Sequence, residues 1–172
     1  MRLPLALAAA LAVPALMPHP ARAQERPPAY TNAEACLRDR AADAVAVSSG
    51  ATDAAEFLLG YLCAETVGYA SAYEQNTASL LAMSDMASGM GQITAQAGGT
   101  KTGENPFDFS TMFGGLKVDP VTGAFVSDPD AEDGFMNGTL KAQAAQMSAL
   151  FGDRPPLFLR VLAGELVLQQ RR

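Results

Sequence analysis

The two cysteines, Cys36 and Cys63, are the residues whose chemistry and spacing are most informative. Their midpoint falls between Ser49 and Gly50, where two helical patterns are interrupted. Two antiparallel helices joined by a tight turn bring together residues that lie at equal distances from that turn. The spacing therefore predicts a Cys36–Cys63 disulfide that staples a helical hairpin, with two buried free thiols as the alternative. A paired state leaves no thiolate for nucleophilic catalysis.

Acid–base chemistry has few candidates. The only histidine is His19, which lies in a segment that we expect to be removed. A mature chain without imidazole excludes Ser-His-Asp and Cys-His catalysis and His-containing zinc sites. Glu65 lies on an otherwise apolar helical stretch and is a candidate general acid if burial raises its pKa. The alternative that we favour is a position at a solvated edge, or an ion pair with an arginine such as Arg38 or Arg40. We expect no enzyme and keep a carboxylate-dependent hydrolase as a minor alternative.

Two patterns have the ligand types that metals require. Met83, Met86 and Met90 share a helix face by their spacing, and three thioethers are suitable ligands for Cu(I). We favour the alternative that these methionines fill gaps in the core. The acidic stretch 128–133 resembles a calcium loop only superficially, because the glycine and the final glutamate of an EF-hand are misplaced or missing. The sequence therefore predicts no resident cofactor.

The elements that position these residues are mainly helical. A capping box at Thr31–Glu34 predicts the start of the first helix, and Ser48–Gly50 interrupts it. The box spacing recurs at Asp53–Glu56, where a second helix should begin. The helical pattern then continues, so residues 53–97 form one long helix or two, with Asn76–Thr77 as the favoured break.

The composition changes over residues 98–128, where Gly, Asp, Thr and Phe replace Ala and Leu. Leu116–Val118 and Ala124–Val126 flank a Pro/Gly turn and predict a small β-hairpin. Such a hairpin is barely stable alone, so it must dock on the helices or on a partner. Helical spacing returns over residues 139–151. The last segment, 155–170, fits a helix, with a strand pair as the alternative.

The first residues have the pattern of an export signal. A short positive start, an apolar segment over residues 3–17 and an Ala-Arg-Ala motif predict a signal peptide, 1–23, that is cleaved after Ala23. A flexible lead-in, 24–30, and one helical domain, 31–172, would follow. We expect a bacterial periplasmic or secreted protein, and such compartments favour disulfides.

Charge and hydropathy narrow the classes of partner. The chain has 18 acidic and 12 basic residues. An acidic surface disfavours nucleic acid, because phosphate binding requires concentrated Lys and Arg. No apolar run of bilayer length follows the export signal, so we expect no transmembrane span in the mature chain.

Two sets of residues are candidate contact surfaces for a protein partner. The aromatic anchors are Phe107, Phe109, Phe113 and Phe125, for which packing on the helices is the favoured alternative. The small residues recur every four positions and permit close helix approach: Gly60, Ala64, Gly68 and Ala72. They predict a contact with the Cys36 helix or with the C-terminal part of the chain, and a homodimer interface is the alternative.

The sequence thus predicts a mainly α protein, a disulfide-stapled antiparallel helical hairpin or bundle with a small β-hairpin excursion. Our leading hypothesis is an exported, non-enzymatic envelope protein that acts as a protein-interaction or structural module. The alternative is a periplasmic carrier of a small ligand, or of Cu(I) held by methionine. Helices rich in Ala, Gly and Met can leave an apolar cavity between them.

Overall fold

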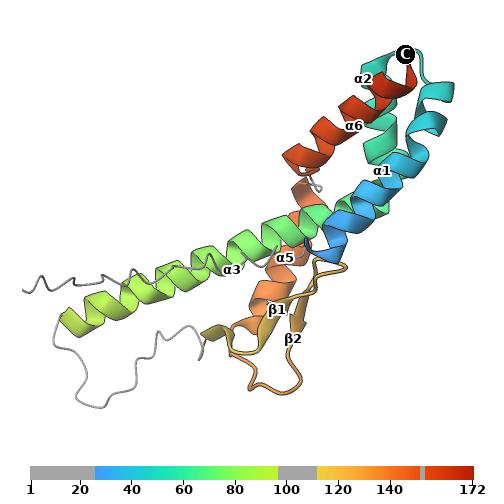
Figure 1. Ribbon diagram of the computed structural model, residues 1–172. Helices are drawn as coiled ribbons and strands as arrows, with labels where there is room; N and C mark the ends of the chain where they lie inside the picture. The colour runs from blue at the N-terminus through green and yellow to red at the C-terminus, as the bar shows by residue number, and fades with distance from the viewer. Residues whose placement is uncertain (1–25, 97–111, 152–153) are drawn as a thin grey trace, which may run out of the picture.

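The computed structural model describes residues 26–96, 112–151 and 154–172, and it is mainly helical (Figure 1). The helical segments are α1 (Pro28–Val47), α2 (Ala51–Phe57), the π-helical segment η1 (Leu58–Leu62), α3 (Ala64–Gln96), α5 (Asn137–Phe151) and α6 (Leu157–Gln170). Two short strands, β1 (Leu116–Val118) and β2 (Phe125–Ser127), pair antiparallel, with Lys117 opposite Val126. The predicted helical fold with a small β-hairpin is confirmed.

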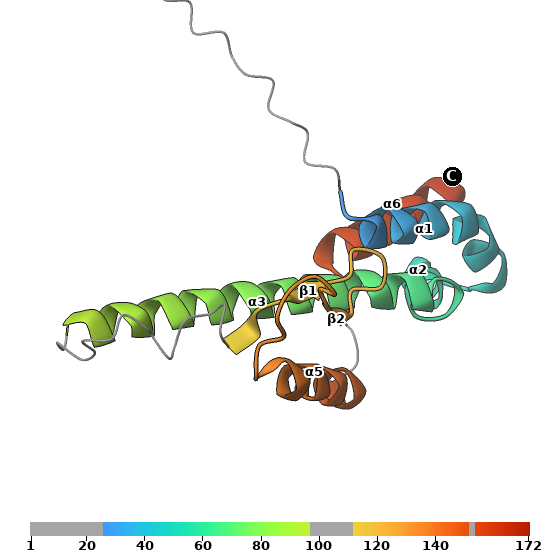
Figure 2. The same ribbon diagram turned by 90° about the horizontal axis from the view of Figure 1, so that it is seen from below.

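The helices form a bundle at one end of the molecule and a long arm at the other (Figures 1 and 2). α1, α2 and α6 gather at the start of α3, and α3 continues beyond them. The whole of α3 has 33 residues, a length of about 50 Å at 1.5 Å per residue. Figure 2 shows α5 on the side of α3 that faces away from α1 and α6. Among the described residues, no helix combines the length and the apolar character needed to cross a membrane.

The predicted disulfide joins Cys36 of α1 to Cys63, where η1 meets α3, with 5.9 Å between the two Cα atoms. The turn that separates α1 from α2 lies at Ser48–Gly50, as the midpoint predicted. α6 runs in the same direction as α1, and its last turn closes on this hairpin. There the guanidinium of Arg171 donates to the Ser48 carbonyl (2.9 Å) and to the Ser49 carbonyl (3.4 Å).

Small side chains set the packing of the bundle. The core-facing residues of α1 recur every three or four positions and are fully buried: Ala29, Ala33, Leu37, Ala41 and Ala44. α6 contributes Leu159, Ala163 and Val167 to the same core, one helical turn apart. Because the distance between packed helices depends on the side chains at the contact, alanine lets these backbones approach closely.

The expected start of the first helix is wrong. α1 begins at Pro28, within the expected lead-in and three residues before Thr31. Proline is suited to the first helical position because its φ is fixed and it needs no hydrogen-bond acceptor. The N–H of Ala29 donates to the Pro120 carbonyl of the hairpin (2.8 Å), and no side chain caps the helix. A contact from distant sequence therefore replaces the predicted capping box.

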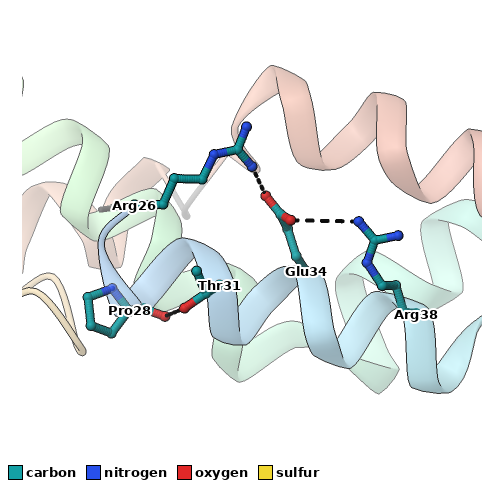
Figure 3. Close-up of polar contacts among 5 residues, drawn as sticks. All are labelled: Arg26, Pro28, Thr31, Glu34 and Arg38. Carbon is teal, nitrogen blue, oxygen red and sulfur yellow. Dashed lines mark hydrogen bonds and ion pairs between the residues drawn. The ribbon is translucent and has the colours of Figure 1, made fainter. Parts of the chain in front are cut away.

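Glu34 has a different partner from the one that a capping box requires. Its carboxylate forms ion pairs with Arg26 and with Arg38, the latter at 3.7 Å, as Figure 3 shows. In the same view the Thr31 hydroxyl donates to the Pro28 carbonyl (3.1 Å). Both side chains thus bind groups other than the helix N–H groups that a capping box would satisfy.

The second predicted capping box is also wrong. α2 begins at Ala51 with Gly50 in the N-cap position, so Asp53 lies within the first helical turn. Its carboxylate accepts a hydrogen bond from the Ser49 hydroxyl (3.1 Å). A carboxylate in the first turn is still favourable, because it faces the positive end of the helix dipole.

In the described part of this stretch, residues 53–96, the helix is divided, but the favoured break at Asn76–Thr77 is wrong. α3 continues through both residues without interruption. The irregularity is η1, where the N–H of Cys63 donates to the carbonyl of Leu58 (2.9 Å), five residues earlier. Such a widened turn rotates the following helix relative to the preceding one, and it coincides with the cross-linked cysteine.

The two C-terminal segments are both helices. The strand-pair alternative for 155–170 is wrong, because α6 spans nearly all of it. α5 begins two residues before the expected start at Thr139. Its first residue, Asn137, is buried, and the side-chain amide donates to the Gly114 carbonyl (2.9 Å) and to the Asp133 carboxylate (3.1 Å). This amide ties α5 to the loops before and after the hairpin.

The hairpin tip docks on the helices. The Asp119 carboxylate accepts the N–H groups of Thr122 (3.0 Å) and Val121 (2.7 Å), and these bonds hold the pKa of Asp119 below its usual range. The Asn76 side chain of α3 donates to the carbonyl of Gly123 (2.8 Å). Gly123 has φ +72°, and a Cβ there would lie 2.6 Å from the Tyr69 carbonyl oxygen. Only glycine permits this approach of the hairpin to α3.

Removal of the cross-link should lower the free energy of unfolding by about 3 kcal/mol. The disulfide joins residues 27 positions apart, so it restricts a sizeable loop in the unfolded chain. Denaturant unfolding of the oxidised protein, the reduced protein and the Cys36→Ala/Cys63→Ala variant measures the effect. The reduced wild type controls for the change of side chain, and equal midpoints for the oxidised and reduced proteins would contradict the prediction.

Gly123→Ala should detach the hairpin tip from α3. A side chain at positive φ costs about 1–2 kcal/mol, and the added methyl group overlaps the α3 backbone. We expect a lower melting temperature and faster hydrogen exchange at the Ala29 amide, because this amide donates to the Pro120 carbonyl of the hairpin. Gly138→Ala is the matched control, because a Cβ there meets no atom within 4 Å. Equal exchange in the two variants would show that the approach does not require glycine.

Candidate functional site

The predicted aromatic anchors that the structure describes face the interior. Phe113 is 8% exposed and forms a second hydrophobic cluster with Leu116 and Leu140. Phe125 is partly buried against the same cluster. Phe107 and Phe109 lie outside the described residues. Phe113 and Phe125 therefore pack on the helices, which is the alternative that we favoured.

The candidate thioether ligands lie in different surroundings. Met83 packs against the second hydrophobic cluster, whereas Met86 is 62% exposed on the arm of α3. The side chain of Met90 lies outside the described part of the chain. Within residues 26–96, 112–151 and 154–172, no group of three or more His, Cys, Asp or Glu side chains is placed to hold a metal ion.

Glu65 lies on the surface of α3. Its carboxylate accepts a hydrogen bond from the Tyr69 hydroxyl (2.9 Å), and this bond raises the pKa of Tyr69. The exposure of Glu65 agrees with the solvated-edge alternative. Pairing with Arg38 or Arg40 is wrong, because both arginines form ion pairs with carboxylates of α1 itself. Glu65 is exposed, and the partner that the structure gives its carboxylate is the Tyr69 hydroxyl of the same helix.

The acidic stretch after the hairpin has structural partners. Asp128 forms an ion pair with Lys117 and accepts the N–H of Asp130 (3.2 Å), and these contacts lower its pKa. Hydrogen bonds from Ser127 and Asn137 lower the pKa of Asp133. Both carboxylates therefore serve the hairpin and its exit turn.

The small-residue stripe does not face the core of the bundle. At this level of α3 the core-facing residues are Val67, Ala70 and Ser71. Ala64, Gly68 and Ala72 instead line a groove of about 530 Å³ between α3, the hairpin and α5. We call this the α3–α5 groove. The stripe therefore faces α5, which belongs to the C-terminal part of the chain, across an open groove. Of the two predicted contacts, the one with the Cys36 helix is wrong.

Alanines of α5 form the opposite wall of the α3–α5 groove, and polar groups lie among its lining residues. Ala144 and Ala145 face the stripe, and the lining includes Glu65 and Lys141. The Lys141 ammonium donates to the Ser127 hydroxyl (2.6 Å). Small apolar walls and a few polar groups are the usual composition of a small-molecule site.

α6 carries large apolar side chains on two opposite sides. Leu159, Ala163 and Val167 are fully buried in the bundle. The side opposite the core exposes Leu157 (71%), Val161 (53%) and Leu168 (56%). We call this second side, together with Phe158, the outer α6 face.

A shallow groove of about 570 Å³ adjoins the outer α6 face, where α6 approaches α3. We call it the α3–α6 groove. Its apolar lining is provided by α6, and its charged lining residues are Glu74 of α3 and Glu165 of α6. Beneath Phe158, the Tyr30 ring packs edge-on at 5.1 Å. Burial, with the nearby Glu74 carboxylate, raises the pKa of Tyr30.

Comparisons of the chain with protein-family models, with curated proteins and with solved structures found no match. Function therefore has to be argued from the chain's own residues. Sequence reasoning missed the outer α6 face because the spacing of Leu157 and Val161 is also that of a single core-facing pattern. The available signal was that large apolar residues occur on more than one side of α6, which is more than one buried side requires.

Proposed function

We propose that the protein is an exported, non-enzymatic interaction module of the bacterial envelope, and that it binds another protein through the outer α6 face. The exposure of Leu157, Val161 and Leu168 carries this proposal. A helix that buries one apolar side normally has polar residues on the opposite side, and adjoining exposed apolar residues mark interaction sites. The described residues leave this side of α6 uncovered.

Two further observations support the proposal. The Cys36–Cys63 disulfide suits an oxidising compartment, in keeping with the export pattern of residues 1–23. The candidate general acid, Glu65, binds the Tyr69 hydroxyl, and Asp128 of the acidic stretch binds Lys117 and the Asp130 N–H. Phe107 and Phe109 remain predicted anchors for the same partner.

Polar substitutions on the outer α6 face should abolish partner binding and leave the fold intact. The variant is Leu157→Ser/Val161→Ser/Leu168→Ser, in which all three side chains are more than half exposed. The measurement is quantitative mass spectrometry of proteins from the source cells that are retained by the immobilised wild type and by the variant. We expect the variant to retain one or more proteins at least about tenfold less, because the apolar surface that it removes should contribute about 1.4 kcal/mol or more to binding.

The control is Leu81→Ser/Met86→Ser on the arm of α3, where both side chains are similarly exposed. It removes surface hydrophobicity without touching α6, so it should retain the same proteins as the wild type. An identical set of retained proteins for all three chains would refute the outer α6 face as a binding surface. Circular dichroism and melting temperature report whether each variant keeps the fold.

The α3–α5 groove favours a second candidate function, a small-ligand carrier. Its volume of about 530 Å³ falls within the range of small-molecule sites. Ala64 and Ala145 line it and are exposed, so larger side chains can occupy it without displacing the core. The predicted homodimer interface overlaps this groove, because it consists of Gly60, Ala64, Gly68 and Ala72.

Ala64→Phe/Ala145→Phe should remove any ligand that co-purifies with the wild type, because two phenyl rings fill much of the groove. Native mass spectrometry of the intact protein measures both bound ligand and dimer. Ala42→Phe, on the exposed side of α1, is the matched control and should retain the ligand. A wild-type monomer without added mass would count against both the carrier and the homodimer.

A further inference from the structure

The α3–α6 groove combines an apolar lining with two carboxylates. Leu157, Val161 and Leu162 belong to its apolar wall, and Glu74 and Glu165 are its charged lining residues. Both glutamates are exposed, and neither has an ion pair within the described part of the chain. An apolar strip bordered by uncompensated negative charge is complementary to an apolar strip bordered by positive charge.

The chain already places one cation beside this groove. The guanidinium of Arg26 lies over the Phe158 ring, with 6.0 Å from Cζ to the ring centroid. The same guanidinium forms an ion pair with Glu34 (Figure 3). Glu34 therefore compensates the charge of Arg26, and among the described residues Arg26 forms no ion pair with Glu74 or Glu165. Arg26 therefore shows that the aromatic end of the groove accepts a cation, and it leaves the two groove carboxylates without one.

We infer that the occupant of the α3–α6 groove is a cationic amphipathic helix of a partner protein, with an apolar stripe flanked by Lys or Arg. This inference rests on the proposed function and specifies its partner. The apolar stripe would pack on Leu157 and Val161, and the flanking cations would pair with Glu74 and Glu165. Helix-in-groove recognition has this division between apolar anchors and charged borders.

Other occupants fit less well. In a two-fold dimer the same surface serves both copies, so one interface would contain Glu74 and Glu165 of each copy. Like charges across an interface are unfavourable. Anionic lipid and nucleic acid meet the same repulsion, because their phosphates would approach two glutamates.

The test uses the full chain and two labelled helical peptides of about 18 residues, or five turns. Both peptides carry the same leucine stripe, flanked by lysine in one and by glutamate in the other. Fluorescence anisotropy should show binding of the lysine peptide and not of the glutamate peptide. Glu74→Gln/Glu165→Gln should weaken binding of the lysine peptide about three- to thirtyfold, the range expected for two border charges.

Glu56→Gln/Glu132→Gln is the matched control, because it removes the same charge from two exposed glutamates outside the groove. It should change binding less than about twofold. Equal weakening by the two pairs would show non-specific attraction to an acidic protein, which would overturn the inference. Equal binding of the two peptides, or no binding of the lysine peptide, would overturn it as well.

Leu157→Ser/Val161→Ser separates this inference from the proposed function. In one outcome, this variant loses binding of both peptides and Glu74→Gln/Glu165→Gln has no effect. That result would support an apolar interaction face on α6 and would refute the preference of this face for cations. Sedimentation velocity provides the remaining outcome. A wild-type dimer that dissociates in the Leu157→Ser/Val161→Ser variant would identify a second copy as the occupant and would refute the cationic partner.

Discussion

Close helix packing through alanine is the constraint on which the rest of the structure depends. Four of the five buried positions of α1 are alanine, so α6 and the start of α3 can approach its backbone closely. Each alanine removes little apolar surface from water, and the free energy gained per residue is small. A covalent link between α1 and the η1–α3 junction offsets this by reducing the conformational freedom of the unfolded chain.

A thin core also explains why α6 keeps an uncovered side. Leu159, Ala163 and Val167 meet α1 and its neighbours, and no further layer covers the opposite side among the described residues. α5 follows the other side of α3, as Figure 2 shows, so it cannot cover α6. The outer α6 face is therefore exposed because the bundle packs against only one side of α6.

Features set by local sequence were predictable, and features set by distant contacts were not. The disulfide follows from two cysteines placed symmetrically about a Ser-Gly turn, and the hairpin follows from its Asp-Pro and Gly signals. The start of α1 depends on the carbonyl of Pro120, and nothing near Thr31 reveals that contact. The groove carboxylates, Glu74 and Glu165, line the same groove only because α6 is held in place by its packing on α1 and α2.

The outer α6 face is held at both of its ends, and this bears on its capacity to bind. Near its first turn, Phe158 packs on Tyr30 at 5.1 Å, and at its last turn Arg171 donates to the Ser48 carbonyl. Both contacts are with α1 or the turn that follows it, and the disulfide fixes that helix to α3. A binding helix that is already ordered loses little conformational entropy when a partner docks. The same thin, cross-linked bundle that leaves α6 half covered therefore also presents its uncovered half in one fixed geometry.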